Sequence, residues 1–148
     1  MTMPRADRPR HPTMRMAAFG LLLLLTSGGN ALAQKAPDLS GLWQTETAGS
    51  TVRIARCGSG YCGTIAATAG TGVDAQNPDP ALRTRKLVGV QIMQAGTPSG
   101  AGFEGSLYNP NDGKTYAGSL TPKGTDTVEV AGCVLSVLCK RQTWRRIR

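Results

Sequence analysis

Asn77, Asp79, Arg83 and Arg85 lie within nine positions of the chain, and together they could bind an anionic group. The planar fork of an arginine guanidinium matches the oxygens of a carboxylate or a phosphate. A purely structural interpretation is also open: Asp79 pairs with Arg83, or the asparagine and the aspartate cap a short helical turn. We take these four residues as the candidate ligand-binding residues.

The chain offers little for acid–base or nucleophilic catalysis. Its only histidine, His11, lies in an N-terminal segment that we interpret below as cleaved, so the rest lacks the usual base of a Ser-His or Cys-His mechanism. Five carboxylates fall on expected strand faces and turns, where solvated carboxylates are the default: Asp74, Asp79, Glu104, Asp112 and Glu129. We therefore expect no catalytic residue, no enzyme activity and no cofactor.

Metal binding is also disfavoured by the sequence. Residues 109–113, Asn-Pro-Asn-Asp-Gly, offer oxygen ligands but lack the acidic repeat and the terminal glutamate of a calcium loop. Four cysteines could hold zinc, yet the spacings of four and five residues within the two pairs differ from the short C-x2-C knuckle. We expect a simple turn at 109–113 and no bound metal.

The N-terminal segment has the order of features typical of a secretory signal. Arginines precede the apolar run 16–25, and Ala31-Leu32-Ala33 supplies the small-x-small pattern of a signal-peptidase site. As a membrane anchor the run would be short, since a spanning helix needs roughly 18 to 20 apolar residues. A lipid anchor would need a cysteine at the cleavage point, and the first cysteine is Cys57. We predict a cleavable signal peptide, residues 1–33, and a soluble domain, residues 34–148, that is periplasmic or secreted.

The charge of the predicted domain is modestly positive. Without the four basic residues and one acidic residue of 1–33, the chain's 17 basic and nine acidic residues fall to 13 and eight, a net charge of +5. A nucleic-acid binder would interleave aromatic residues with its basic clusters, and only Trp144 does so here. We expect no nucleic-acid partner; the charge favours solubility or weak attraction to an anionic envelope surface.

The first two cysteines predict one disulfide of an oxidising compartment. Alternation along the two flanking strands places Ile54 and Ile65 on the core face. If Cys57 lies opposite Cys62, antiparallel pairing also places the two isoleucines opposite each other. Core and disulfide then require the same register.

The last two cysteines also predict a disulfide whose register agrees with the pairing of core residues. Cys133 opposite Cys139 aligns Val128 with Trp144, so apolar residues again meet. The intervening residues 134–138 are too apolar for an ordinary surface turn. We expect that segment to fold over an end of the core.

The rest of the chain consists of short alternating segments separated by turn residues, without an amphipathic helix of useful length. Eight strands in up-and-down order would close a small antiparallel barrel without exposed edges. The long connection between the third and fourth strands, residues 68–86, carries the candidate ligand-binding residues, and loops of this length are often functional. The predicted strands are 41–47, 51–57, 62–67, 87–94, 102–108, 114–121, 126–133 and 139–147.

Several motifs follow one another along residues 39–147. They include Gly41-Leu42-Trp43, Cys57-Gly58 with Cys62-Gly63, Asn77-Pro78-Asp79, Tyr108-Asn109-Pro110 and Gly132-Cys133. Their order and spacing resemble the bacterial exported family of unknown function numbered 2147. That family has no assigned activity to transfer, and its fold resembles the lipocalin or calycin type of barrel.

The lipocalin resemblance also implies a role for one tryptophan. In lipocalins the tryptophan of a G-x-W motif packs at the closed end of the barrel, under an arginine of the last strand. The resemblance assigns this place to Trp43, with Arg141, Arg145 and Arg146 as candidates for the arginine. We take Arg145, while a lone G-x-W also fits a simple core tryptophan.

Two functions follow from these expectations. The leading hypothesis is a non-enzymatic barrel that holds an apolar or amphiphilic small molecule, while loops at its mouth choose the head group. Few large aromatic residues at inward positions leave space for it. The glycine-rich interior could instead be solid, and the domain would then act as an envelope protein-interaction or structural module through residues 134–138 or the arginine-bearing loop.

Overall fold

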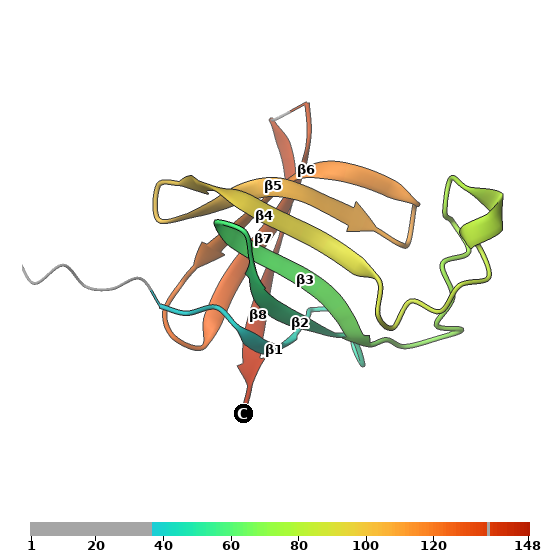
Figure 1. Cartoon of the computed structure of the whole chain (residues 1–148), viewed down its shortest axis with the longest axis horizontal. Helices are drawn as coiled ribbons and strands as arrows, with labels where there is room; N and C mark the ends of the chain where they lie inside the picture. The colour runs from blue at the N-terminus through green and yellow to red at the C-terminus, as the bar shows by residue number, and fades with distance from the viewer. Residues whose placement is uncertain (1–36, 136) are drawn as a thin grey trace, which may run out of the picture. The chain divides into compact units, whose positions relative to one another are not determined.

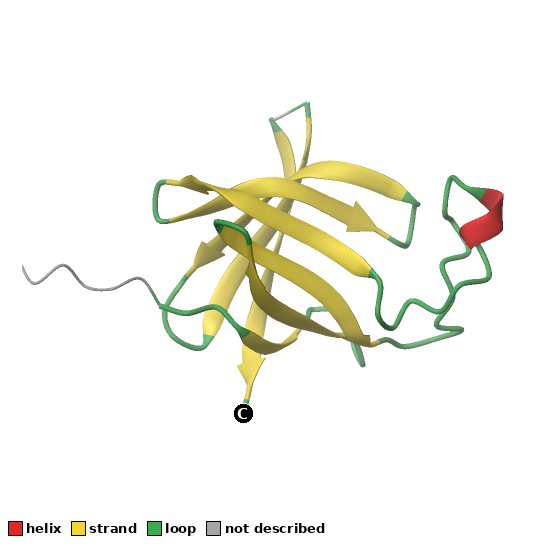
Figure 2. Ribbon diagram, viewed as in Figure 1, coloured by secondary structure: helices red, strands yellow, loops and turns green. Residues whose placement is uncertain are grey.

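Eight antiparallel strands joined in chain order make up most of the described structure (Figures 1 and 2). The computed structural model describes residues 37–135 and 137–148. The predicted signal peptide, residues 1–33, lies outside them, and its cleavage stays a prediction. The strands are β1 (Gly41–Gln44), β2 (Thr51–Cys57), β3 (Gly60–Ala67), β4 (Gln91–Ser99), β5 (Gly102–Asn109), β6 (Lys114–Pro122), β7 (Thr127–Val134) and β8 (Leu138–Ile147).

The first and last strands also pair with each other, so the sheet closes into an up-and-down barrel. This confirms the predicted fold class. The helical component in the described residues is the 3-10 turn η1 (Pro80–Leu82) in the long loop. No helix among these residues has the length and apolar character that a membrane crossing requires.

Most strands end within a few residues of the predicted boundaries, and two of the boundaries differ because a backbone hydrogen bond turns the chain. β1 stops at Gln44, since the Thr45 N–H donates to the Ser50 carbonyl oxygen at 3.1 Å. β4 starts only at Gln91, because the Val90 N–H donates to the Leu87 carbonyl oxygen at 2.9 Å. The long loop between β3 and β4 therefore comprises residues 68–90.

Alternation along the strands separates the core from the surface. On β2 the side chains of Val52 and Ile54 are buried while Arg53 between them is exposed. The turns β2–β3, β4–β5 and β6–β7 form one end of the barrel, and the other four connections form the opposite end. The buried core residues include Leu39, Trp43, Val52, Ile54, Tyr61, Ile65, Met93, Leu120, Val128, Val130 and Trp144.

The end at the β6–β7 turn is closed by Trp43, as the lipocalin resemblance implies. The indole is fully buried, and its Nε1–H donates to the Leu39 carbonyl oxygen at 2.9 Å. The guanidinium carbon of Arg146 lies 4.4 Å from the centre of the ring, which is cation–π geometry. Arg146 also donates to the carbonyl oxygens of Ser40 at 2.6 Å and Thr125 at 2.9 Å.

The choice of Arg145 as the barrel-closing residue is therefore wrong. Arg145 is exposed, because alternation on β8 turns it away from the face that carries the buried Trp144. Arg146, two positions after Trp144, shares the inward face. Strand periodicity counted from Trp144 would have identified it.

Both predicted disulfides are present, but one strand register differs from the prediction. Cys57 is bonded to Cys62, yet Cys57 pairs in the ladder with Gly60, and Ile54 pairs with Gly63 rather than with Ile65. A two-residue turn begins at Gly58, whose φ of 56° suits glycine. The shift of two residues keeps every side chain on its expected face.

The β7–β8 hairpin has the predicted register. Cys133 pairs with and is bonded to Cys139, and Val128 pairs with Trp144. The expectation that residues 134–138 fold over the core is wrong for those that the structure describes, since all four are exposed: Val134, Leu135, Val137 and Leu138.

Candidate functional site

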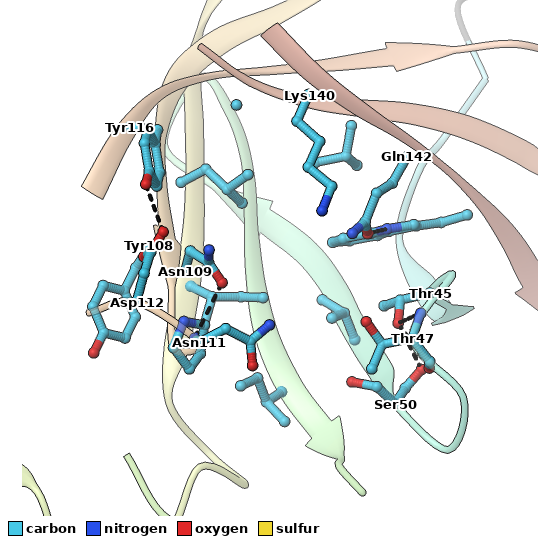
Figure 3. A pocket seen from close by; sticks show the side chains of 18 of the residues that line it. Thr45, Thr47, Ser50, Tyr108, Asn109, Asn111, Asp112, Tyr116, Lys140 and Gln142 are labelled. Carbon is cyan, nitrogen blue, oxygen red and sulfur yellow. Dashed lines mark hydrogen bonds between the residues drawn. The ribbon is translucent and has the colours of Figure 1, made fainter. Parts of the chain in front are cut away.

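A cavity of about 410 Å³ opens at the end of the barrel opposite Trp43. Its walls come from the strands and from the connections β1–β2, β3–β4 and β5–β6 (Figure 3). The strands supply an apolar inner wall, while the connections supply mostly polar groups. The apolar strand residues are Val52, Ile65, Ile92, Leu107, Val130, Val134, Leu138 and Trp144.

The closed end of the barrel is filled by large rings, among them the buried Trp43. There Tyr61 and Phe103 pack edge to face, with ring centres 5.2 Å apart. Nearer the mouth, the wall includes Gly132, where a Cβ atom would lie 3.3 Å from Leu107 Cδ2. A glycine among aliphatic residues leaves volume that a larger side chain would occupy.

The polar rim comes from three separate segments (Figure 3). β8 contributes Lys140 and Gln142, and Figure 3 shows the Lys140 side chain extending into the cavity mouth. Gln142 is fixed by the Trp144 Nε1–H, which donates to its Oε1 at 2.8 Å. The other segments contribute Thr45, Thr47 and Ser50 before β2, and Asn109 at the end of β5 with Asn111 and Asp112 in the turn that follows it.

The two charged side chains of the described cavity wall have different surroundings. Asp112 accepts a hydrogen bond of 2.6 Å from the Tyr116 hydroxyl, and its Oδ1 accepts the Lys114 N–H at 3.0 Å. The Tyr116 bond, the largest cause, lowers the pKa of Asp112 below its ordinary value. Lys140, in contrast, belongs to none of the ion pairs formed among the described residues. Its ammonium is therefore the charged group of the mouth that can bind a ligand.

The predicted ligand-binding residues lie in the long loop and outside the cavity wall. Two of them, Asn77 and Arg85, contact Asp74, which was expected to be solvated and is instead fully buried. The Asp74 carboxylate accepts hydrogen bonds from the Tyr108 hydroxyl at 2.6 Å and from Asn77 Nδ2 at 2.7 Å. Arg85 adds its Nε at 2.9 Å and a terminal nitrogen at 2.7 Å.

This network fixes the charge of the buried carboxylate. Burial by itself would raise the pKa of Asp74, but hydrogen bonds from Tyr108, Asn77 and Arg85 outweigh it and hold the pKa below its ordinary value. Burial also raises the pKa of the Tyr108 hydroxyl, and its bond to Asp74 adds to the rise. The Tyr108 hydroxyl therefore stays protonated while the Asp74 carboxylate stays ionised at neutral pH.

The remaining predicted residues make contacts within the loop. The Asp79 N–H donates to Asn77 Oδ1 at 2.9 Å, and Asp79 Oδ1 accepts the Ala81 N–H at 2.9 Å as the cap of η1. Arg83 donates from Nε to the Asn77 carbonyl oxygen at 2.9 Å. These contacts match the capping interpretation. Ligand binding by Asn77, Asp79, Arg83 and Arg85 stays a prediction.

The loop network reaches the cavity through one tyrosine. Tyr108 lines the cavity and binds Asp74, so it joins the long loop to the end of β5. Beside it, Gly113 has a φ of 68°, and a Cβ atom there would lie 1.7 Å from the Gln76 carbonyl oxygen. The loop can therefore pack directly against the β5–β6 turn, as Figure 1 shows. It buttresses one side of the mouth.

Sequence reasoning missed Lys140, Gln142 and Asp74. The first two share the inward face of β8 with Trp144, so counting alternate positions back from that tryptophan would have found them. Asp74 carries no such local signal, because its partner Tyr108 is 34 residues away. Among the described residues there is no group of three or more histidine, cysteine, aspartate or glutamate side chains placed to hold a metal ion.

The fold has a counterpart among solved structures. A Helicobacter pylori protein, described as belonging to the lipocalin family, superposes with a TM-score of 0.66 and 23% sequence identity. The match covers 76% of this chain and 84% of that one, and at this identity it shows the shared fold. No curated protein matches the chain.

A family model matches most of the barrel sequence. It spans residues 41–146, from the start of β1 almost to the end of β8. The model is that of DUF2147, described as an uncharacterised protein conserved in bacteria. The chain belongs to this family, and its own fold is a lipocalin-like barrel.

Proposed function

We propose that this protein is a non-enzymatic carrier that binds one small anionic amphiphile in its barrel. The single observation that carries the proposal is the cavity of about 410 Å³, apolar inside and polar at its mouth. Small-molecule sites commonly measure about 300 to 1,000 Å³ and combine an apolar lining with a few polar groups. The apolar part of the ligand would contact Ile65, Ile92 and Val130.

Lys140 is the residue proposed to bind the head group. Its side chain extends into the mouth, and it lacks an ion pair with the described residues. The opposing charge, Asp112, is already engaged by Tyr116 and Lys114. A carboxylate, sulfate or phosphate near Lys140 would therefore gain a charge-assisted hydrogen bond, and its repulsion by Asp112 would be small.

The decisive experiment fills the cavity and measures binding of anilinonaphthalene sulfonate, an anionic amphiphile whose fluorescence rises in apolar surroundings. Ile92→Phe adds volume to the partly buried wall and should weaken binding by about tenfold or more. Ile92→Leu conserves volume and serves as the control. Equal binding by Ile92→Phe and the unaltered protein would exclude the cavity as the site.

A second pair of variants tests the head-group assignment. Lys140→Gln should weaken binding of the same probe by about tenfold, since it removes one charge-assisted hydrogen bond. Lys140→Arg keeps the charge and should stay close to the unaltered protein. If Lys140→Gln binds the probe as tightly as Lys140→Arg and the unaltered protein, Lys140 takes no part in binding. Native mass spectrometry of protein purified from its own cells would then identify any retained small molecule.

Export is part of the proposal. The two disulfides, Cys57–Cys62 and Cys133–Cys139, support an oxidising compartment, periplasmic or extracellular. Mass spectrometry of the protein from a periplasmic fraction and from the medium should find a chain beginning at Gln34. An intact N-terminus would refute cleavage of residues 1–33.

A protein-interaction or structural role in the envelope is the second candidate. The observation that favours it is the exposed apolar end of the β7–β8 hairpin. The same purified protein distinguishes the two candidates, since a carrier retains a small molecule and an interaction module co-purifies with a protein.

A further inference from the structure

The β7–β8 hairpin carries four exposed aliphatic side chains. Val134 is 47% exposed, Leu135 84%, Val137 76% and Leu138 71%. We call these four residues the apolar tip. The hairpin projects beyond the neighbouring strands (Figure 1), so these side chains belong to a convex feature.

Folding alone does not account for the apolar tip. Leu135 has a φ of 52°, a left-handed conformation that glycine or asparagine adopts more easily, and its side chain is almost entirely in solvent. The Cys133–Cys139 disulfide ties the two strands together directly below the tip. A constrained hairpin that displays aliphatic groups to water marks a surface for another apolar phase.

Two lysines flank the apolar tip. Lys114 lines a surface groove together with Val134 and Leu135, and Lys140 follows Leu138 by two positions on β8. Neither lysine takes part in the ion pairs of the described residues. Aliphatic side chains with ammonium groups beside them match an anionic bilayer, where the former enter the acyl boundary and the latter lie among head groups.

We infer that the apolar tip inserts into the surface of an anionic phospholipid membrane, with Lys114 and Lys140 contacting the head groups. Size favours lipid over a protein partner or a second copy. A stable protein interface uses about 20 to 30 residues from each side and is enriched in aromatic groups, whereas the tip offers four aliphatic residues. A lipid surface adapts to a small convex apolar feature.

The inference stands independently of the proposed carrier function, but the two are spatially connected. Val134 and Leu138 belong to the apolar tip and also line the cavity. Insertion of the tip would therefore bring the cavity mouth to the bilayer surface. An amphiphile could pass between membrane and barrel without crossing bulk water.

Vesicle flotation tests the inference, with protein purified as its own cells process it and its N-terminus verified by mass. Vesicles are phosphatidylcholine with or without phosphatidylglycerol. The unaltered protein should float with the anionic vesicles, and added salt should reduce the bound fraction. Leu135→Ser combined with Val137→Ser should lower the partition coefficient by about tenfold or more. Both residues are exposed, so the melting temperature should be retained.

Matched variants separate the contributions of the apolar tip, of Lys114 and of the cavity to vesicle binding. Ile147→Ser removes a 41% exposed aliphatic side chain from the opposite end of β8 and should bind vesicles normally. Lys114→Gln should lower binding severalfold on anionic vesicles alone. Ile92→Phe fills the cavity without touching the tip and should leave vesicle binding unchanged, so failure of the carrier proposal would not affect this result.

Three results would overturn the inference. The first is absence of flotation by the unaltered protein, and the second is equal flotation by the doubly substituted tip. The third is a dimer in analytical ultracentrifugation that the tip substitutions dissociate, since a second copy would then cover the tip.

Discussion

The two ends of the barrel are built from the same strands but differ in packing: one is closed by buried side chains and the other holds a cavity. At the closed end, Trp43 is fully buried and Arg146 covers its ring while holding the carbonyl oxygens of Ser40 and Thr125. At the open end, aliphatic residues and Gly132 leave a cavity, and a buried carboxylate, Asp74, fastens a long loop beside it. We therefore expect a larger contribution to stability from the first end, whereas the second provides accessible volume.

The largest effect should come from the closed end. Trp43→Ala removes the central ring and leaves a cavity, which should lower the free energy of unfolding by about 3 to 5 kcal/mol. Arg145→Ala on the exposed face should change it by no more than about 0.5 kcal/mol. Chemical denaturation measures both. A small effect of Trp43→Ala would contradict the proposed division between the ends.

The next effect tests the loop network at the open end. Asp74→Asn leaves Arg85 without its partner and should cost about 2 to 3 kcal/mol, less than a fully buried pair because the Arg85 side chain is 35% exposed. Arg83→Ala with Arg85→Ala should lower the melting temperature and leave amphiphile binding unchanged. Weaker binding at an unchanged melting temperature would instead support the predicted loop site.

The pH dependence of stability follows from the same carboxylate. The folded pKa of Asp74 is below its ordinary value of 3.8, so its stabilising contribution is complete above the unfolded pKa and is lost as pH falls through the folded pKa. Asp74→Asn should therefore show a shallower loss of stability below about pH 4 than the unaltered protein. The pKa of Asp112 is also lowered, as is that of Asp38, whose carboxylate accepts the Ser40 N–H. Both groups titrate in both proteins, so the difference between the two curves isolates Asp74. Superimposable curves would contradict this assignment.

Loss of a disulfide should lower the free energy of unfolding by a smaller amount. Only the disulfide at the open end should also affect vesicle binding. Each closes a short loop, so Cys57→Ser with Cys62→Ser, or Cys133→Ser with Cys139→Ser, should cost about 2 kcal/mol. The second pair lies below the apolar tip, and its loss should also reduce vesicle binding. The first pair lies at the closed end and should leave vesicle binding intact. Flotation of the two folded variants tests the distinction.

The smallest expected change in stability is at the cavity itself. Ile92→Phe places extra atoms beside empty space, so its stability should stay within about 1 kcal/mol of the unaltered protein even though probe binding falls. Thermal unfolding and fluorescence titration of the same preparation provide the two values. A large destabilisation would mean that the wall is already fully packed at Ile92.

Strand alternation was sufficient to predict the barrel and both disulfides, because period-2 patterns and turn residues are local features. It failed where strand register or burial depends on a residue distant in the sequence or on the exact geometry of a turn. The two-residue turn at Gly58 shifted one register, and the burial of Asp74 depends on Tyr108 from a distant strand. The exposed apolar tip contradicts the rule that apolar residues are buried, and such exceptions are where function is expected.

Barrel closure has a consequence for the order of folding. Seven of the eight strand pairings join strands that follow one another in the chain, whereas β1 and β8 pair Trp43 with Arg146 across almost the entire domain. Contacts between residues far apart in sequence form slowly, because chain entropy must be lost before the contact stabilises anything. The seam between β1 and β8 is therefore expected to close last. Until then the open sheet exposes two unpaired edges, so the seam sets the period during which a newly synthesised chain is most prone to aggregate.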